Sequence, residues 1–183
     1  MIPILLLCAV LFQSGPQTAP TPLIDNDRVT VWDGGTSPAA QSLDAVVVSL
    51  SGSAEFLPKG KASNTAGRSI VIDLKDHPAV LVTNLTAYPL AFPRPGSKKL
   101  LENERVIVWD YTWKPGVATP MHFHDKDVVV VFLEDGDLSS TTPDGQVVVN
   151  SYTSGTVRFN PRGRIHTETL VRGKEHAIIT ELK

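Results

Sequence analysis

The chain has little of what marks several functional classes. It has one cysteine, Cys8, so no disulfide can form within the chain. Its formal charge is −2, and its acidic and basic residues are interspersed without a basic stripe or a polybasic block. We therefore expect neither a nucleic acid nor an anionic membrane surface as its partner. A small molecule is the more natural ligand.

Long apolar runs are also scarce, and the longest covers residues 2–12. These eleven residues are too few to span a bilayer, so no transmembrane span is expected, but they match the apolar core of a secretory signal. No Lys or Arg precedes Arg28, which is atypical of such signals, and a buried N-terminal strand is the alternative. We predict a signal peptide over residues 1–19, whose removal takes Cys8 with it, and a periplasmic or secreted protein.

No stretch of useful length shows the periodicity of an amphipathic helix, and the pattern from Arg28 onward is that of β-strands. Short runs rich in β-branched residues alternate with turn residues such as Asp33-Gly34-Gly35. The expected strands are Val29–Val31, Ala45–Leu50, Ser69–Leu74, Ala79–Thr83, Ile107–Trp109, Val128–Leu133, Val147–Val149, Val157–Phe159 and Ala177–Leu182. Many short strands at regular intervals favour an all-β sandwich or barrel.

An internal repeat divides the chain. Asn26–Asp33 matches Asn103–Asp110 almost residue for residue. Two further parallels pair Val46–Gly52 with Val130–Gly136, and Gly67–Leu74 with Gly155–Pro161. We predict a duplicated fold with lobes at residues 20–97 and 98–183, joined through Tyr88–Lys99. The alternative is a strand start that recurs without duplication.

Three histidines form a pattern typical of a metal site. His122 and His124 stand at i and i+2, so on a strand their side chains leave the same face, while Phe123 points the other way. Neutral imidazole is the commonest protein metal ligand, and two of them on one strand form half of a site. His166 follows a short strand and the Pro161–Gly163 turn, and it is the candidate third ligand.

These residues resemble the two motifs of the cupin superfamily over roughly residues 103–183. Gly116, His122, His124 and Gly136 fit the first motif, and Gly155, Pro161, Gly163 and His166 fit the second. The resemblance implies a double-stranded β-helix, a jelly-roll-like barrel. Together with the repeat it implies two cupin-like lobes, of which residues 98–183 bind the metal and residues 20–97 are a degenerate lobe without ligands.

Two departures from the motifs shape the expected site. The glutamate of the first motif is replaced at both candidate positions, Val128 and Val129, and the asparagine of the second motif falls on Leu170. Asp127 precedes the glutamate position by one residue, which on a strand turns it to the opposite face. We therefore predict a site of three histidines. His77, before a proline, and His176 are expected to be structural.

The expected ligand set selects the metal. Three neutral imidazoles favour a divalent transition ion over Mg²⁺ or Ca²⁺, which need oxygen ligands. Fe(II) is the expected ion, with Zn, Ni, Cu and Mn as alternatives, and three protein ligands leave coordination positions open. Cavity residues are expected among Trp109, Tyr111, Trp113 and Arg158. Arg158 shares a strand face with Asn160, and that face points either to the cavity or to solvent. In the cavity, Arg158 would hold a carboxylate bidentately.

Two functions of different class follow. The first is an exported, non-haem oxygenase of a small organic acid or phenolic compound, which the resemblance to three-histidine cupin dioxygenases implies. The run from His124 to Gly136 also resembles small stand-alone cupins associated with amino-acid breakdown. The second is a non-catalytic envelope protein that binds a small molecule or a metal. A fold alone does not decide between them, so whether the protein is an enzyme stays open, as does a homodimer.

Overall fold

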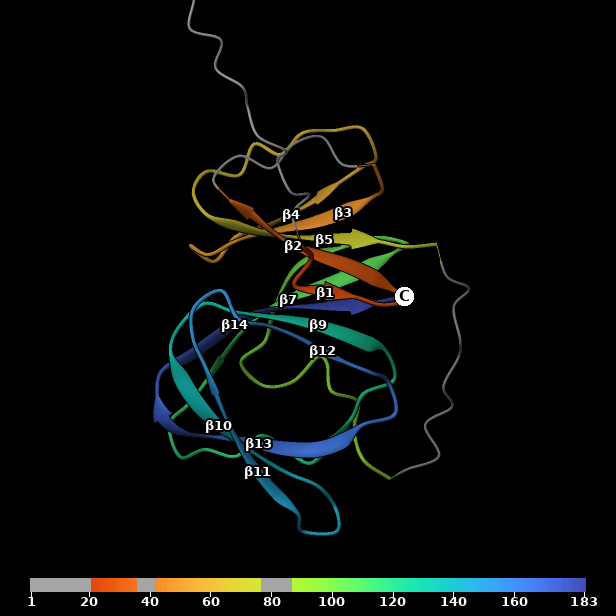
Figure 1. The fold of residues 1–183 in the computed structure, drawn as a ribbon. Coiled ribbons are helices and arrows are strands. Elements are labelled where there is room, and N and C mark those ends of the chain that lie inside the picture. Colours follow the sequence, from red (N-terminus) through yellow and green to blue (C-terminus); the bar gives the residue numbers. More distant parts are fainter. Residues whose placement is uncertain (1–20, 36–41, 77–86) are drawn as a thin grey trace, which may run out of the picture.

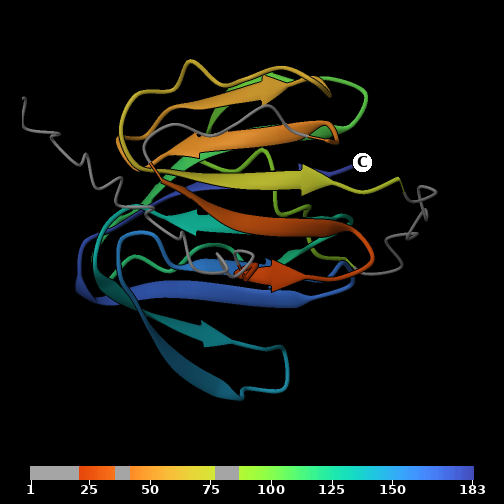
Figure 2. The same ribbon diagram turned by 45° about the horizontal axis from the view of Figure 1, so that its top comes forward.

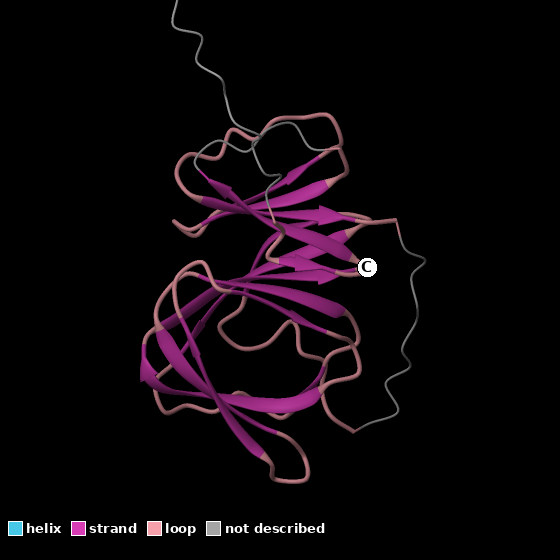
Figure 3. Cartoon of the chain, viewed as in Figure 1, coloured by secondary structure: helices cyan, strands magenta, loops and turns pink. Residues whose placement is uncertain are grey.

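The computed structural model describes residues 21–35, 42–76 and 87–183. The predicted signal peptide, the predicted strand Ala79–Thr83 and His77 lie outside the described residues, and these predictions stay predictions. Every regular element that is described is a β-strand, which confirms the all-β prediction (Figure 3). The described residues include no helix with the length and apolarity that crossing a membrane requires.

The strands form three sheets. The first has five strands in the order β1 (Ile24–Asp25), β2 (Val29–Gly35), β5 (Ser69–Leu74), β3 (Ala45–Ser49) and β4 (Ala54–Leu57). The second has five strands in the order β6 (Lys98–Glu102), β7 (Val106–Trp113), β14 (Glu175–Leu182), β9 (Asp127–Phe132) and β12 (Val157–Asn160). The third has four strands in the order β8 (His122–Phe123), β13 (Ile165–Gly173), β10 (Gly136–Thr141) and β11 (Val147–Tyr152).

The second and third sheets are the two walls of a barrel, as Figure 1 shows. Aromatic and aliphatic side chains fill the space between them, including Trp109, Phe132 and Leu170. This is the double-stranded β-helix that the motifs predicted. The segment Leu90–Gly96 also belongs to the barrel, since Ala91 N donates to Phe123 O (2.9 Å) and Phe92 packs in the same core. Part of the stretch expected only to join the lobes therefore builds the second lobe.

The first sheet packs on the outer face of the second (Figures 1 and 2). Strand alternation gives each sheet a row of inward β-branched and leucine side chains, and the two rows meet in one core. The facing residues are Val29, Val31, Val46, Val48, Ile70, Ile72 and Leu74 on one side and Val106, Val108, Val129, Val131, Ile178 and Leu182 on the other. Burial of this apolar area is the main stabilisation that joins the two halves.

The pairing order of the strands supports the first parallel of the repeat, because β2 holds the place of β7. Val29 pairs with Leu74 at the end of β5, and Val106 pairs with Leu182 at the end of β14. The aligned runs are therefore Ser69–Leu74 and Ala177–Leu182. Our alignment of Gly67–Leu74 with Gly155–Pro161 was wrong, because β12 corresponds to β4. Our alignment of Val46–Gly52 with Val130–Gly136 was one residue out, because Val46 pairs with Ile72 as Val129 pairs with Thr180. All these strands carry similar β-branched runs, so only the pairing order distinguishes them.

Equivalent side chains make equivalent contacts in the two copies. The Oδ1 atom of Asn26 accepts from the backbone N–H groups of Arg28 and Val29, and that of Asn103 accepts from Arg105 and Val106. Three cross-strand pairs also recur: Trp32–Asp73 with Trp109–Glu181, Asp25–Lys75 with Glu102–Lys183, and Asp33–Arg68 with Asp110–His176. His176 therefore has the structural role that was expected.

The contacts between the sheets are reciprocal, as in a two-fold symmetric dimer. Arg28 lies 3.4 Å from Asp127, and its counterpart Arg105 lies 3.3 Å from Asp44, the counterpart of Asp127. Arg28 also donates to the Lys183 carbonyl (3.0 Å), and Arg105 donates to the Lys75 carbonyl (3.2 Å). The two halves of the chain are thus packed like two copies of one unit.

The copies differ in what lies between their strands. β3 turns into β4 through residues 50–53, whereas β10 and β11 lie between β9 and β12. β13 separates β12 from β14, and a loop over residues 58–68 takes its place in the first copy. In the described residues, the first lobe is therefore the five-stranded half of the cupin fold, and the four-stranded wall belongs to the second lobe alone.

Candidate metal centre

The three histidines come together on the four-stranded wall. His122 on β8 and His166 on β13 are direct cross-strand partners. His124 follows β8, and two backbone hydrogen bonds hold it: its N–H donates to Arg164 O (2.9 Å) and its carbonyl accepts from Gly163 N (2.8 Å). Gly163 has φ +87°, which favours glycine at this turn. The predicted Pro161–Gly163 turn thus positions both His124 and His166.

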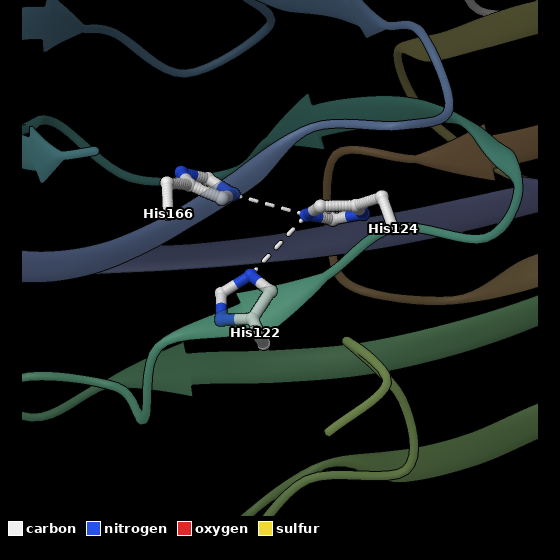
Figure 4. A group of neighbouring side chains, drawn as sticks. All are labelled: His122, His124 and His166. Atoms are coloured by element: carbon white, nitrogen blue, oxygen red, sulfur yellow. Dashed lines mark hydrogen bonds between the residues drawn. The ribbon is translucent and has the colours of Figure 1, made fainter. Parts of the chain in front are cut away.

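The imidazole nitrogens converge (Figure 4). His124 Nε2 lies 3.2 Å from His122 Nε2 and 3.0 Å from His166 Nε2. Two nitrogens bound to one ion at about 2.1 Å, at right angles, would be about 3.0 Å apart. All three side chains are buried. The group is thus a set of three ligand atoms that could hold a metal ion.

The protonation states also fit a metal. His122 Nδ1 lies 2.8 Å from the Pro120 carbonyl, which can only accept, so Nδ1 carries the proton and Nε2 presents a lone pair to the group. Burial, followed by the neighbouring imidazoles, lowers the pKa of His124 to about 2. Burial and then the charge of Arg164 lower the pKa of His166 to about 2. All three rings are therefore neutral at physiological pH, the form that binds metals.

The side chains around the group lie where the strand pattern placed them. Val128 is at the inner face of the barrel and lines a cavity with His124, whereas Val129 packs between the sheets. Asp127 points away from the group, and it pairs with Arg162 (2.7 Å) and Arg28. Leu170 packs in the barrel core. The two candidate positions for the glutamate of the first motif are thus occupied by valines, and the neighbouring carboxylate of Asp127 does not reach the histidines.

A cavity inside the barrel adjoins the histidines. Its volume is about 40 Å³, which is enough for about three water molecules. Its walls are Phe92, Arg94, Trp113, His124, Val128, Val130, Phe132, Leu138, Ser140, Asn150, Tyr152, Arg158, Asn160, Arg164, Glu168 and Ile179. A larger hollow of about 390 Å³ lies elsewhere, beside Arg28 and Arg105, and none of the histidines that the structure describes lines it.

Two of the four expected cavity residues line the cavity. Trp113 is part of its wall, and Arg158 lies at its exposed end, so the face of Arg158 and Asn160 is the cavity face. Trp109 and Tyr111 are buried in the barrel core behind the wall. The Trp109 N–H donates to Glu181 (2.8 Å), which is a structural contact. Neither of them lines the cavity as expected, because Phe92 stacks on the Trp109 ring and the Arg94 guanidinium lies over the Tyr111 ring.

Sequence reasoning missed three charged residues of the cavity, Arg94, Arg164 and Glu168. Glu168 lies two residues after His166 on β13, so the strand period alone could have placed both on one face. Its Oε1 lies 4.0 Å from His166 Nδ1, and its Oε2 accepts from the Trp113 N–H (3.1 Å). Arg94 comes from the irregular segment before β6, and no periodicity indicates its direction.

The charge of the cavity is positive. Three arginines, Arg94, Arg158 and Arg164, line it together with a single carboxylate, Glu168. Arg164 is engaged in the wall, where it donates to Asn160 Oδ1 (2.9 Å) and Ser140 Oγ (3.0 Å). Ser140 Oγ also lies 3.0 Å from His166 Nδ1 and holds that ring in place. Such a cavity favours an anionic ligand.

No family model matches the chain, but it is similar to known proteins, three of which follow. The chain is 33% identical over 86 residues to the β-alanine degradation protein BauB of Pseudomonas aeruginosa, covering 45% of this chain and 87% of that protein. It is 31% identical to a cupin domain from Bordetella pertussis, covering 51% of this chain and 99% of that one, with a TM-score of 0.44. A cupin 2 conserved barrel domain protein from Leptotrichia buccalis is 12% identical and matches 94% of this chain and 92% of its own, with a TM-score of 0.49.

Proposed function

This chain belongs to the cupin superfamily, and from that premise we propose that it binds a divalent transition metal through His122, His124 and His166 and oxygenates a small organic acid. The single observation that carries the proposal is the convergence of the three imidazoles: His124 Nε2 lies 3.2 Å from His122 Nε2 and 3.0 Å from His166 Nε2. The three rings are buried and neutral, and two of them are held by partners on Nδ1. That is the arrangement of a preformed metal site.

Fe(II) is the proposed ion, and Zn, Ni, Cu and Mn are the alternatives that nitrogen ligands admit. When bound, Fe(II) with open positions supplies oxygen chemistry, and Zn would supply an activated water. The side chains of the cavity have two roles: they limit the access of water, and they orient the substrate. Val128 and Phe132 keep an apolar wall beside His124, which limits the access of water, and Arg94, Arg158 and Arg164 supply positive charge for an acidic substrate.

The size of the cavity supports a small substrate. Room for about three water molecules suits a substrate with few non-hydrogen atoms. The name of the Pseudomonas relative refers to the degradation of β-alanine, a three-carbon amino acid, and this supports an acid of similar size. We propose that the substrate is such an acid or a product of its breakdown.

A second function is favoured by one observation. Val128 stands where a carboxylate ligand is expected from the motif, and the cavity is small. Both features also suit a non-catalytic protein that holds a metal or a small anion in the cell envelope. The two proposals differ in turnover and not in binding.

Oxygen consumption separates them. The protein is purified without a histidine tag, reconstituted with Fe(II), and mixed with β-alanine and three-carbon acids in an oxygen electrode. Stoichiometric iron with acid-dependent oxygen uptake supports the oxygenase. Stoichiometric iron without uptake on any acid of this size supports the binding protein, and protein that takes up no transition metal contradicts the oxygenase.

A further inference from the structure

Arg94 is a buried cation whose hydrogen-bonding capacity is not used up. Its side chain is 6% exposed and lines the cavity. Both terminal nitrogens lie 3.5 Å from Glu168 Oε2, at the limit of a hydrogen bond. Its Nε atom is buried and has no acceptor. A guanidinium has five N–H donors, so most of those of Arg94 remain available.

The position of this guanidinium is fixed in advance. Three aromatic rings surround it: its central carbon lies 3.9 Å from the ring centroid of Tyr111, 4.7 Å from that of Phe92 and 5.6 Å from that of Trp113. Ser97 closes its loop, because Ser97 Oγ accepts from Arg94 N (3.1 Å) and donates to Arg94 O (2.7 Å). A planar group stacked on aromatic faces loses little freedom when it binds a carboxylate.

The other two arginines of the cavity differ from Arg94. Arg164 has its donors on Asn160 and Ser140 within the wall. Arg158 lies exposed at the open end, where water and salt screen its charge. A buried polar atom without a partner is rare in a folded protein and calls for an explanation. An anionic oxygen of a ligand would supply the missing acceptor.

We propose that Arg94 is the anchor that binds the carboxylate of a small aliphatic acid in the cavity beside the three histidines. Glu168, held by Trp113, positions the guanidinium by facing its two terminal nitrogens and leaves Nε for the ligand. A phenol offers one oxygen and no such fork, so the site selects acids over phenolic compounds. This specifies the substrate class within the proposed function, which it takes as its premise.

The test compares propionate with propionamide, which has the same shape but no charge. Calorimetric titration of the Zn-loaded, tag-free protein should show propionate binding at least about 10-fold more tightly than propionamide. Arg94→Gln should lose that preference and keep its zinc, and Arg94→Lys should retain part of it, because a point charge replaces the fork. Arg68→Gln is the matched control, since Arg68 is paired with Asp33 in the first lobe, and it should bind propionate like the wild type.

Equal affinity of the wild type for propionate and propionamide would overturn the proposal, even if Arg94→Gln failed to fold. Unchanged propionate binding by folded Arg94→Gln would overturn it as well, as would a loss on Arg158→Gln alone. The zinc content of the same samples reports separately on the metal site. If the protein binds no metal but still discriminates propionate from propionamide through Arg94, the proposed metal-dependent function is refuted and the role of Arg94 as a carboxylate anchor is supported.

Discussion

The two five-stranded sheets of this protein are built alike, and only one of them carries a site. In each, an asparagine between the first two strands accepts from two backbone N–H groups, and a tryptophan N–H donates to a buried carboxylate, Asp73 or Glu181. Their facing valines form one core. The three histidines, in contrast, all lie on segments that have no counterpart among the described strands of the first lobe. Scaffold and chemistry are therefore separate in this chain.

One pair of equivalent positions shows how the difference arises. Arg158 and Glu55 hold the same place, opposite Val130 and Val47. Arg158 lines the cavity. Glu55 instead accepts hydrogen bonds from Ser63 and Thr65 of the loop that follows its own strand. The second lobe keeps a cavity because a four-stranded wall spans that face, whereas the first lobe covers the matching face with its own loop.

The packing of the sheets also limits how the chain can associate. The outer face of the barrel sheet is buried against the first lobe through reciprocal contacts of Arg28 and Arg105. The first lobe thus takes the place that a second copy would have in a two-fold dimer. A homodimer of this chain stays a prediction, and it would need another surface.

The largest expected effect comes from breaking the shared core. Val31→Asp and Val108→Asp change equivalent, fully buried residues in the two facing sheets. An unpaired carboxylate in this core should destabilise the protein by at least about 4 kcal/mol. Because the core is common to both halves, each variant should unfold the whole molecule in one transition, measured by circular dichroism.

The control for this prediction is Val147→Asp, on an exposed strand position, which should change stability by less than about 0.5 kcal/mol. A barrel that stays folded and binds metal in the Val31→Asp variant would show that the halves are independent.

The next effect concerns a buried carboxyl group, Glu175, that has no counterpart in the first sheet. Glu175 is fully buried, neither of its carboxylate oxygens has a partner, and the equivalent residue of the first sheet is Gly67. Burial, then the charges of Asp135 and Glu134, raise the pKa of Glu175 from 4.5 to about 8. Between these values the folded state holds a proton that the unfolded state has lost, so stability falls as the pH rises through this window and is constant above it.

Glu175→Gln should therefore flatten this dependence. The free energy of unfolding is measured with denaturant at pH 5, 7 and 9. The difference between the variant and the wild type should shift in favour of the variant as the pH rises, by up to about 4 kcal/mol at pH 9. Glu102→Gln is the control, because the hydrogen bonds from Lys183 and Lys99 lower the pKa of the Glu102 carboxyl to about 2. It should not alter the slope in this range. Parallel curves for Glu175→Gln and the wild type would refute the burial argument.

The smallest effect tests whether the copies are energetically equal. Asn26→Ala and Asn103→Ala each leave two backbone N–H groups without their acceptor. Each should cost about 1 kcal/mol, the usual value for a lost cap, and the two should agree within about 0.5 kcal/mol in thermal unfolding. A cost several times larger in one copy would mean that the asparagine contributes unequally to the free energy of unfolding in the two lobes.

Much of this architecture could be predicted, for a physical reason. Strand alternation is local, so it placed His122 and His124 on one face and turned Asp127 away from it, and the repeated Asn-x-Arg-Val pattern revealed the duplication. Pairing order is not local, so the match of β5 with β14 was missed. Arg94 lies in an irregular segment whose direction depends on the aromatic rings of β7, and no period in the sequence encodes that contact.

Metal content tests the central claim most directly. Tag-free wild type, His166→Ala and His176→Ala are analysed by mass spectrometry for bound transition metals after identical reconstitution. His176 pairs with Asp110 outside the converging group, so it is the matched control. The account predicts about one ion per chain in the wild type and in His176→Ala, and close to none in His166→Ala, because two imidazoles alone rarely retain an ion. Full occupancy in folded His166→Ala would contradict it.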